Sequence, residues 1–123
     1  MTREELVRLA VLMNIADDYE EPVHVYQCVL EDLRPCGLAI APEETQRALS
    51  ELTESGLAKA YRLSSREPFA EELQGLPPFD GSYDYYFYIT EQGLRSLAAR
   101  RARDDWPLDD EHELVPGWPG LSD

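Results

Sequence analysis

The stretch ETQRALSELTESGLAKAYRLS, residues 44–64, changes from a helical to an extended pattern at a glycine. Before that glycine, residues that suit a buried helix face recur three or four positions apart: Thr45, Ala48, Leu49 and Leu52. Gly56 is a typical C-terminal cap, because glycine adopts a left-handed backbone without a steric penalty. Residues 57–63 then follow an extended period. The stretch therefore predicts a helix over 42–55 that leads directly into a strand.

A second stretch, DYYFYITEQGLRSLAAR at residues 84–100, makes the opposite change, from strand to helix. Its aromatic residues favour a strand that ends at Ile89. Thr90 can cap the helix that follows, because its hydroxyl accepts a hydrogen bond from a free backbone N–H of the first turn. This helix is expected over 91–103, and three of its residues are expected to face the core: Leu94, Leu97 and Ala98.

Two more helices are predicted before residue 42. The first begins at Thr2, which has the capping-box spacing with Glu5, and it is apolar enough on most sides to lie in the centre of the core. The second begins at Pro22, since a proline in the first turn loses no helical hydrogen bond. Its buried face is predicted at Val23, Tyr26, Leu30 and Leu33. The short apolar run at 38–40 predicts a small strand.

Residues 64–82 connect the two predicted strands, which are therefore expected to pair as a hairpin with a long connection. Prolines and glycines interrupt this segment repeatedly, and only residues 68–74 could hold one or two helical turns. Loops of this length without structure are uncommon in compact domains and are often functional. Four of its residues are too apolar for a solvated loop and are expected to dock on something: Phe69, Leu73, Leu76 and Phe79.

The order of these elements resembles the winged-helix branch of the helix-turn-helix proteins. The two stretches quoted above carry the resemblance, which covers residues 1–103. It implies an α+β fold with a three-helix core, a small antiparallel sheet with a long wing loop, and a C-terminal helix. It also implies that helix 42–55 corresponds to the recognition helix and residues 57–90 to the wing, as in winged-helix transcription regulators that bind DNA.

The charge of the chain opposes that implied activity. Its 123 residues include 25 acids and 11 bases, a formal charge of -14, and the phosphates of duplex DNA repel such a surface. The outer face of helix 42–55 presents Arg47 among three carboxylates, those of Glu43, Glu51 and Glu54. Duplex DNA therefore stays open as a partner but is disfavoured by charge. The residues that would face it are Gln46, Arg47, Ser50, Lys59, Arg62 and Arg66.

Residues 104–123 differ in composition from the domain over 1–103, since they hold seven acids and no base. Their prolines predict an irregular tail, whose acids could pair with the arginines of helix 91–103 in the same chain or in a second copy. Tryptophan and tyrosine supply large contact areas at interfaces. The candidate protein interface consists of wing, strand and tail residues: Phe69, Leu73, Leu76, Phe79, Tyr86, Tyr88, Trp106 and Trp118.

The sequence contains no pattern that supports catalysis. It lacks a nucleophile elbow, a phosphate-binding glycine loop and a dinucleotide fingerprint. His24, Cys28 and Cys36 supply three potential metal ligands without the spacing of a zinc motif, so a half-buried histidine and two core cysteines are the favoured interpretation. We therefore predict no cofactor, no metal and no enzyme activity.

The remaining features predict where and how the chain works. No apolar run has the length of a bilayer span, the N-terminus lacks the features of a signal peptide, and two cysteines do not form a disulfide scaffold. These features predict a cytoplasmic protein without membrane contact. The favoured function is a non-enzymatic winged-helix regulatory or interaction module that contacts another protein or a second copy of itself. The alternative is a winged-helix DNA-binding transcription regulator.

Overall fold

The computed structural model of the chain describes residues 1–77, 85–103 and 105–122. This part of the chain contains four α-helices, one 3₁₀ turn and a three-stranded sheet, which confirms the α+β class. The elements in chain order are α1 (Arg3–Asn14), α2 (Pro22–Asp32), η1 (Arg34–Cys36), α3 (Pro42–Glu54), β1 (Ala58–Leu63), β2 (Ala70–Glu72), β3 (Tyr86–Ile89) and α4 (Glu91–Arg101).

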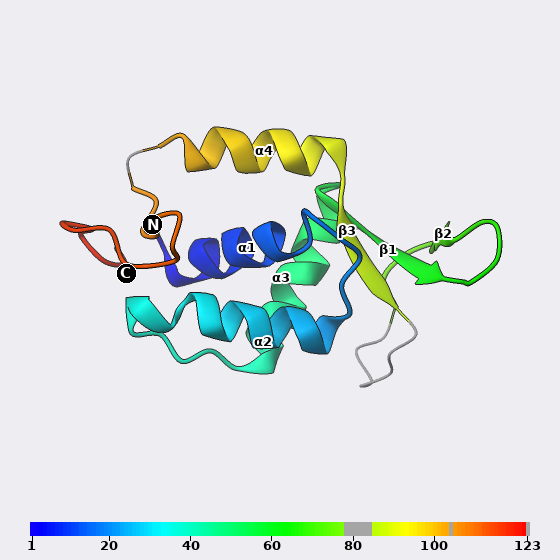
Figure 1. Cartoon of the computed structure of the whole chain (residues 1–123), viewed down its shortest axis with the longest axis horizontal. Coiled ribbons are helices and arrows are strands. Elements are labelled where there is room, and N and C mark those ends of the chain that lie inside the picture. Colours follow the sequence, from blue (N-terminus) through cyan, green and yellow to red (C-terminus); the bar gives the residue numbers. More distant parts are fainter. Residues whose placement is uncertain (78–84, 104, 123) are drawn as a thin grey trace.

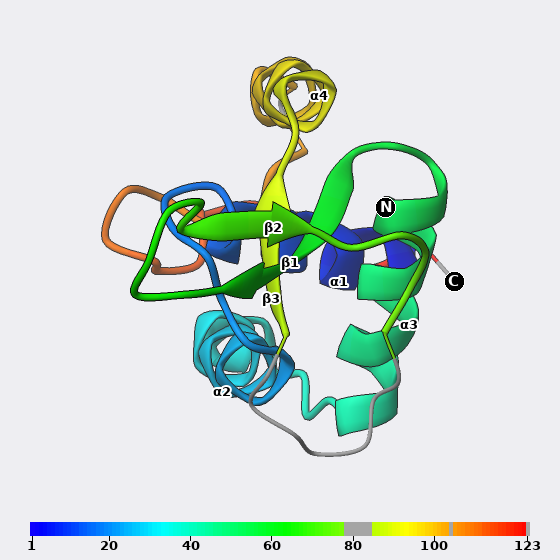
Figure 2. The ribbon, with the colours of Figure 1, turned by 90° about the vertical axis from the view of Figure 1, so that its right-hand side faces the viewer.

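The helices surround α1, which contacts α2, α3 and α4. In Figure 1, α1 lies between α2 and α4, and the sheet lies at one end of the helices. Figure 2 shows the molecule from that end, with the sheet in front of the helices. The tail lies at the opposite end, beside the N-terminus, where the N–H of Ser122 donates to the carbonyl of Met1 at 2.9 Å.

The sheet is antiparallel with the strand order β2-β1-β3. Ala58 of β1 lies opposite Ile89 of β3, so the two sequence-predicted strands do pair with each other. The other edge of β3 is extended by a bridge in which Glu20 and Phe87 exchange two backbone hydrogen bonds, of 2.8 and 3.0 Å. The strand predicted at 38–40 is wrong, because that segment is irregular; Leu38 and Ile40 pack on the core, whereas Ala39 is exposed.

The long connection after β1 contains a strand where the sequence favoured a helical turn. Ala70–Glu72 forms β2, and Leu63 lies opposite Ala70 in the ladder with β1. Because backbone hydrogen bonds to β1 satisfy this segment, it does not need the local bonds of a helix. β1, β2 and the turn between them form a hairpin that projects from the body of the molecule (Figure 1). The predicted interface residue Phe79 lies outside the described residues.

α1 and α3 have the predicted starts and buried faces. The Thr2 hydroxyl accepts from the N–H of Glu5 at 3.1 Å, as expected of an N-cap. The Glu5 carboxylate does not complete the capping box; it binds Arg100 instead. On α3, the predicted inward residues are all buried: Thr45, Ala48, Leu49 and Leu52. Gly56 follows α3 with a φ of +81°, the left-handed conformation that its role as a C-terminal stop requires.

The buried faces of α2 and α4 differ from the prediction. On α2, the fully buried residues are Val25 and Val29 together with Leu33 just beyond its end, whereas Val23 is exposed. On α4, Leu97 and Gly93 are buried but Leu94 is 47% exposed. A three- to four-residue period fixes the spacing of a helical face but leaves its rotation to the neighbouring elements.

The tail folds back onto its own chain. Trp106, Pro107 and Leu108 are buried, and Leu108 forms an antiparallel bridge with Leu114. Of the two routes open from sequence, Asp105 takes the one within the chain, because it binds Arg100. The tail is irregular in backbone, as predicted, but it contributes side chains to the core.

Arg100 joins three parts of the chain: α1, α4 and the tail. Its side chain is only 12% exposed, and it donates to Glu5 at 2.9 Å and to both carboxylate oxygens of Asp105 at 2.6 and 3.1 Å. The hydrogen bonds from Arg100 lower the pKa of both carboxyl groups below their usual range. This effect is opposed, to a smaller extent, by desolvation.

We expect this arrangement to make folding acid-sensitive. A carboxyl with a lowered folded pKa stabilises the fold fully above its unfolded pKa of about 4, and the stabilisation is lost as the pH falls through the folded value. Urea unfolding of the parent chain should therefore show stability falling below about pH 5. Arg100→Gln should be less stable at neutral pH and lose less on acidification. Arg95→Gln, which removes an exposed arginine of the same helix, serves as the control, and equal acid sensitivity in parent and Arg100→Gln would contradict the expectation.

Candidate functional site

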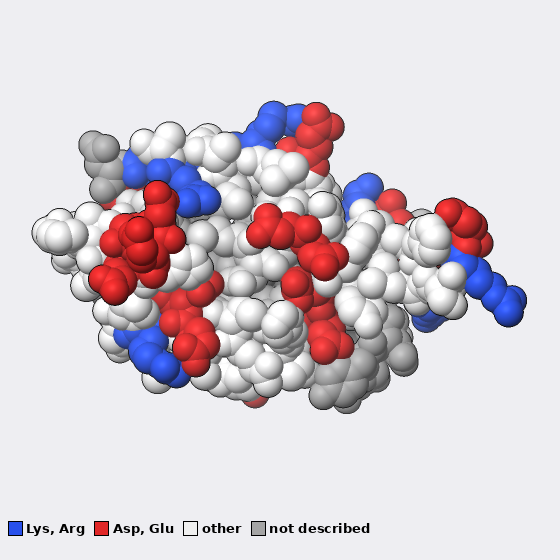
Figure 3. Space-filling view, in the orientation of Figure 1, with Lys and Arg blue, Asp and Glu red and all other residues white. Residues whose placement is uncertain are grey.

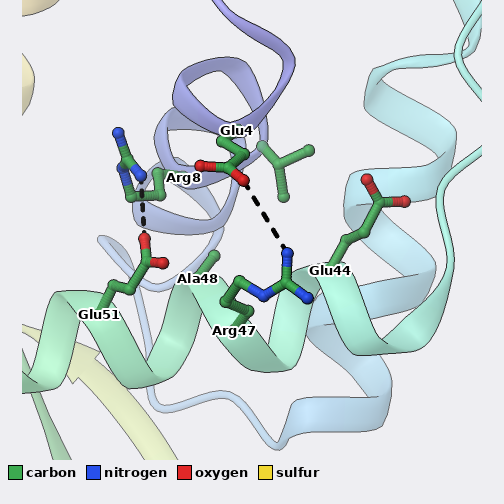
Figure 4. Close-up of a pocket in the computed structure, with 7 residues that line it drawn as sticks. Glu4, Arg8, Glu44, Arg47, Ala48 and Glu51 are labelled. Carbon is green, nitrogen blue, oxygen red and sulfur yellow. Dashed lines mark hydrogen bonds and ion pairs between the residues drawn. The ribbon is translucent and has the colours of Figure 1, made fainter.

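The face of α3 that corresponds to a recognition helix has few free cations. Arg47 points toward α1, where its Nη1 lies 3.9 Å from a Glu4 carboxylate oxygen (Figure 4). Ser50 donates its hydroxyl to the Gln46 carbonyl at 3.0 Å, so this hydroxyl is bound within the helix. Of the three α3 residues expected to face DNA, Arg47 and Ser50 therefore have donors that the chain itself engages.

Two further ion pairs cross from α1 to α3 on this side of the molecule. Arg3 contacts Glu44 at 2.8 Å, and Arg8 contacts Glu51 at 2.9 Å. Figure 4 shows Arg8 and Arg47 each reaching a carboxylate across the shallow pocket between the two helices. The hydrogen bond from Arg3 is the main cause of a lowered pKa at Glu44, which is therefore ionised at neutral pH. Phosphate binding would have to displace these carboxylates, so the surface is poorly suited to a nucleic acid backbone.

The β1–β2 hairpin holds the other predicted DNA-facing residues. Lys59 contacts the Glu72 carboxylate across the strands at 3.2 Å. Arg62 and Arg66 are exposed and form no ion pair with a described residue. Residues 58–77 contain three bases and three acids, so the hairpin has no net charge. In Figure 3 its cations stand beside carboxylates at the projecting end of the molecule.

Apolar side chains also reach the surface of this hairpin. Phe69, beside the turn, is 58% exposed and is the most exposed of the large apolar residues that the structure describes; Leu76 is 39% exposed. Leu73 differs, because it is half-buried and packs against the core. Of the four apolar residues predicted to dock, the structure therefore leaves two on the surface and places one on the chain itself.

The predicted aromatic interface on β3 is occupied by the chain. Tyr88 packs against Tyr19, with ring centroids 4.7 Å apart, and Tyr19 also meets Tyr61 edge to face at 5.2 Å. Burial is the main cause of a raised pKa at Tyr61. Tyr86, the other predicted residue, is half-buried. No sequence pattern pointed to Tyr19, which lies in the acidic run between α1 and α2 and contacts β3 only in the folded chain.

Both tryptophans pack against the core of their own chain. Trp106 is 9% exposed and belongs to the core, and Trp118 is half-buried against it. The expectation that these side chains face a partner is therefore corrected for Trp106. The adjacent Asp105 pairs with Arg100, so both residues lie against the helices.

Three side chains at the start of α2 have the connectivity of a nucleophile, a base and an orienting acid. The Cys28 sulfur lies 3.4 Å from His24 Nε2, and His24 Nδ1 contacts the Glu20 carboxylate. Burial, with the negative charges of Glu20 and Asp32, raises the pKa of the Cys28 thiol. This environment opposes the thiolate that nucleophilic catalysis needs. Across the described ranges, no three acidic, histidine or cysteine side chains are grouped as a metal site.

Comparisons with known proteins identify no relative of this chain. No family model matches the sequence, and neither a curated protein nor a solved structure is significantly similar to it. Among the described residues, no helix combines the length and the hydropathy that crossing a bilayer requires. The arrangement itself, four helices with a small antiparallel sheet, is compatible with the winged-helix resemblance.

Proposed function

We propose that this chain is a non-enzymatic winged-helix interaction module, and that its β1–β2 hairpin binds a second copy of the chain. The winged-helix assignment is supported by the element order. Three helices precede the sheet, α3 enters β1 through Gly56, and α4 follows β3. In this arrangement α3 takes the place of the recognition helix, and the hairpin takes the place of the wing.

The observation that carries the contact is the exposed Phe69 on a hairpin without net charge. Two molecules that each carry a charge of -14 repel each other. They approach at the lowest electrostatic cost through a neutral surface. Burying the exposed part of a phenylalanine contributes about 1–2 kcal/mol per side, and the other hairpin residues buried with it must supply the rest of the free energy of association.

Sedimentation of the full chain over a wide concentration range tests this proposal. We expect the average mass to rise with concentration, and Phe69→Ser to raise the dissociation constant by about tenfold or more. The matched control is Leu114→Ser, which removes a 41% exposed leucine from the tail and should leave association unchanged. A parent chain that stays monomeric at every concentration would overturn the proposal.

A second measurement distinguishes the proposed function from the DNA-binding alternative. Because α3 and its neighbours present arginines already paired with carboxylates, we expect no retention of a labelled duplex even at low ionic strength. DNA binding that weakens steeply with salt would replace the proposed function with that of a transcription regulator. Arg62→Gln and Arg66→Gln would then be the first variants to lose it.

A further inference from the structure

A cleft of about 310 Å³ lies between α1, α2, α4 and the tail, far from the hairpin. Its volume is at the lower end of the range of small-molecule sites, roughly 300–1,000 Å³. It exists only because the tail folds back, since one of its sides consists of tail residues: Trp106, Leu108, Asp109, Asp110 and His112. The tryptophan and the acids that set the tail apart in composition therefore include residues that line the cleft.

The cleft has an apolar wall drawn from three parts of the chain. Met13 comes from α1, Leu97 from α4, and Trp106 and Leu108 from the tail. Leu97, Trp106 and Leu108 are each less than 10% exposed, so packing holds them in place. A wall of this kind accepts a flat, apolar body, and the indole can also attract a cation to its face.

The polar part of the cleft is strongly acidic. Four carboxylates line it, those of Asp17, Asp32, Asp109 and Asp110, against the single guanidinium of Arg101. Asp32 is already bound by Asn14 at 2.9 Å and by His112 at 3.1 Å. Asp17 and Asp110 are exposed and form no ion pair with any residue that the structure describes. The field in the cleft thus favours a cation and opposes an anion.

Trp106 adds an observation independent of charge. Its side chain is more than nine-tenths buried, yet its indole N–H has no hydrogen-bond partner among the described residues. Buried donors of this kind are normally satisfied by protein, water or ligand. A ligand oxygen within the cleft could accept this bond.

We infer that the tail cleft binds a small organic cation: an amine with an aromatic body that also carries a hydroxyl group. The ammonium group lies among the unpaired carboxylates of Asp17 and Asp110. In the proposed complex the ring packs against Met13 and Trp106, and the hydroxyl oxygen accepts a hydrogen bond from the indole N–H. The site shares no residue with the hairpin, so its test is independent of the proposed self-association.

A matched series of three probes isolates the charge of the ligand. Tyramine is the cation, tyrosol replaces its ammonium with a neutral hydroxyl, and 4-hydroxyphenylacetate replaces it with an anion. Each is titrated into the ¹⁵N-labelled full chain while the two indole N–H resonances are followed; Trp118→Phe assigns them. We expect tyramine to shift the Trp106 resonance in a saturable manner. Tyrosol should bind about fivefold more weakly or worse, and the anion weaker still.

Three variants locate the binding site. Asp17→Asn and Asp110→Asn should each weaken tyramine binding by about two- to fivefold, whereas Arg101→Gln should tighten it because a competing cation is removed. Glu54→Gln removes the same charge from an exposed position on α3, outside the cleft, and should change nothing. Equal binding of the three probes, equal effects of Asp17→Asn and Glu54→Gln, or no shift of Trp106 with tyramine would overturn the inference.

Discussion

Gly93→Ala is expected to destabilise the chain by about 3 kcal/mol or more, the range of severe overpacking. An added Cβ would lie 2.2 Å from the carbonyl oxygen of Leu57 and 2.6 Å from Cγ1 of Ile89. The first neighbour is backbone at the start of the sheet, so it cannot rotate away as a flexible side chain can. The change should appear as a lower midpoint in urea unfolding, or as loss of the folded state.

Helix propensity makes the opposite prediction for the same substitution. In an exposed helix interior, alanine is more stable than glycine by about 1 kcal/mol. The close approach of α4 to Leu57 must therefore outweigh this gain. Ser96→Ala changes helix propensity at an exposed position of the same helix, where no backbone neighbour stands in the way. This variant should be as stable as the parent or slightly more stable. A Gly93→Ala chain as stable as its parent would show that α4 does not lie this close to the sheet.

The same contact explains why the sequence did not give the buried face of α4. Its apolar pattern favours Leu94, Leu97 and Ala98 as the inward residues, but Gly93 is the point of closest approach and Leu94 is 47% exposed. A glycine inside a helical pattern signals either a weak helix or a tight contact. The pattern alone does not distinguish the two, because the neighbour at Leu57 is far away in sequence.

Elements with local signals were predicted well. Thr2, Pro22 and Gly56 mark helix boundaries through bonds or dihedral angles within a few residues of themselves, and the structure has the boundaries there. β2 and the bridge at Glu20 had no such signal. β2 is created by hydrogen bonds to β1 across a short turn, and the bridge at Glu20 by hydrogen bonds to a strand distant in sequence. The strand propensities of the individual residues do not encode these pairings.

The candidate sites also divide into features with a local sequence signal and features that depend on the fold. The loop pattern singled out Phe69 and Leu76 as apolar residues expected to dock on something, and the structure leaves both of them exposed. The pairing of Arg47 with Glu4 depends instead on how α3 crosses α1. The tail cleft depends on four separate segments, so its residues were visible in the sequence only as an acidic tail that contains tryptophan.

Trp106→Ala is expected to lower the stability of the chain by about 3–5 kcal/mol, the usual consequence of truncating a buried tryptophan. The indole is 9% exposed and packs in the same core cluster as Leu97. Circular dichroism in urea measures the loss without relying on the fluorophore that is removed. Trp118→Ala truncates the same side chain at a half-buried site and should have a clearly smaller effect.

The comparison decides whether the tail is part of the domain. If Trp106 anchors it, Trp106→Ala should also expose the tail to limited proteolysis, since the tail then loses its buried indole. We expect the ion pair of Asp105 with Arg100 not to keep this part of the tail docked by itself. A Trp106→Ala chain that retains the stability of its parent would mean that residues 1–103 fold without the tail, and the cleft would then be an occasional state of the protein.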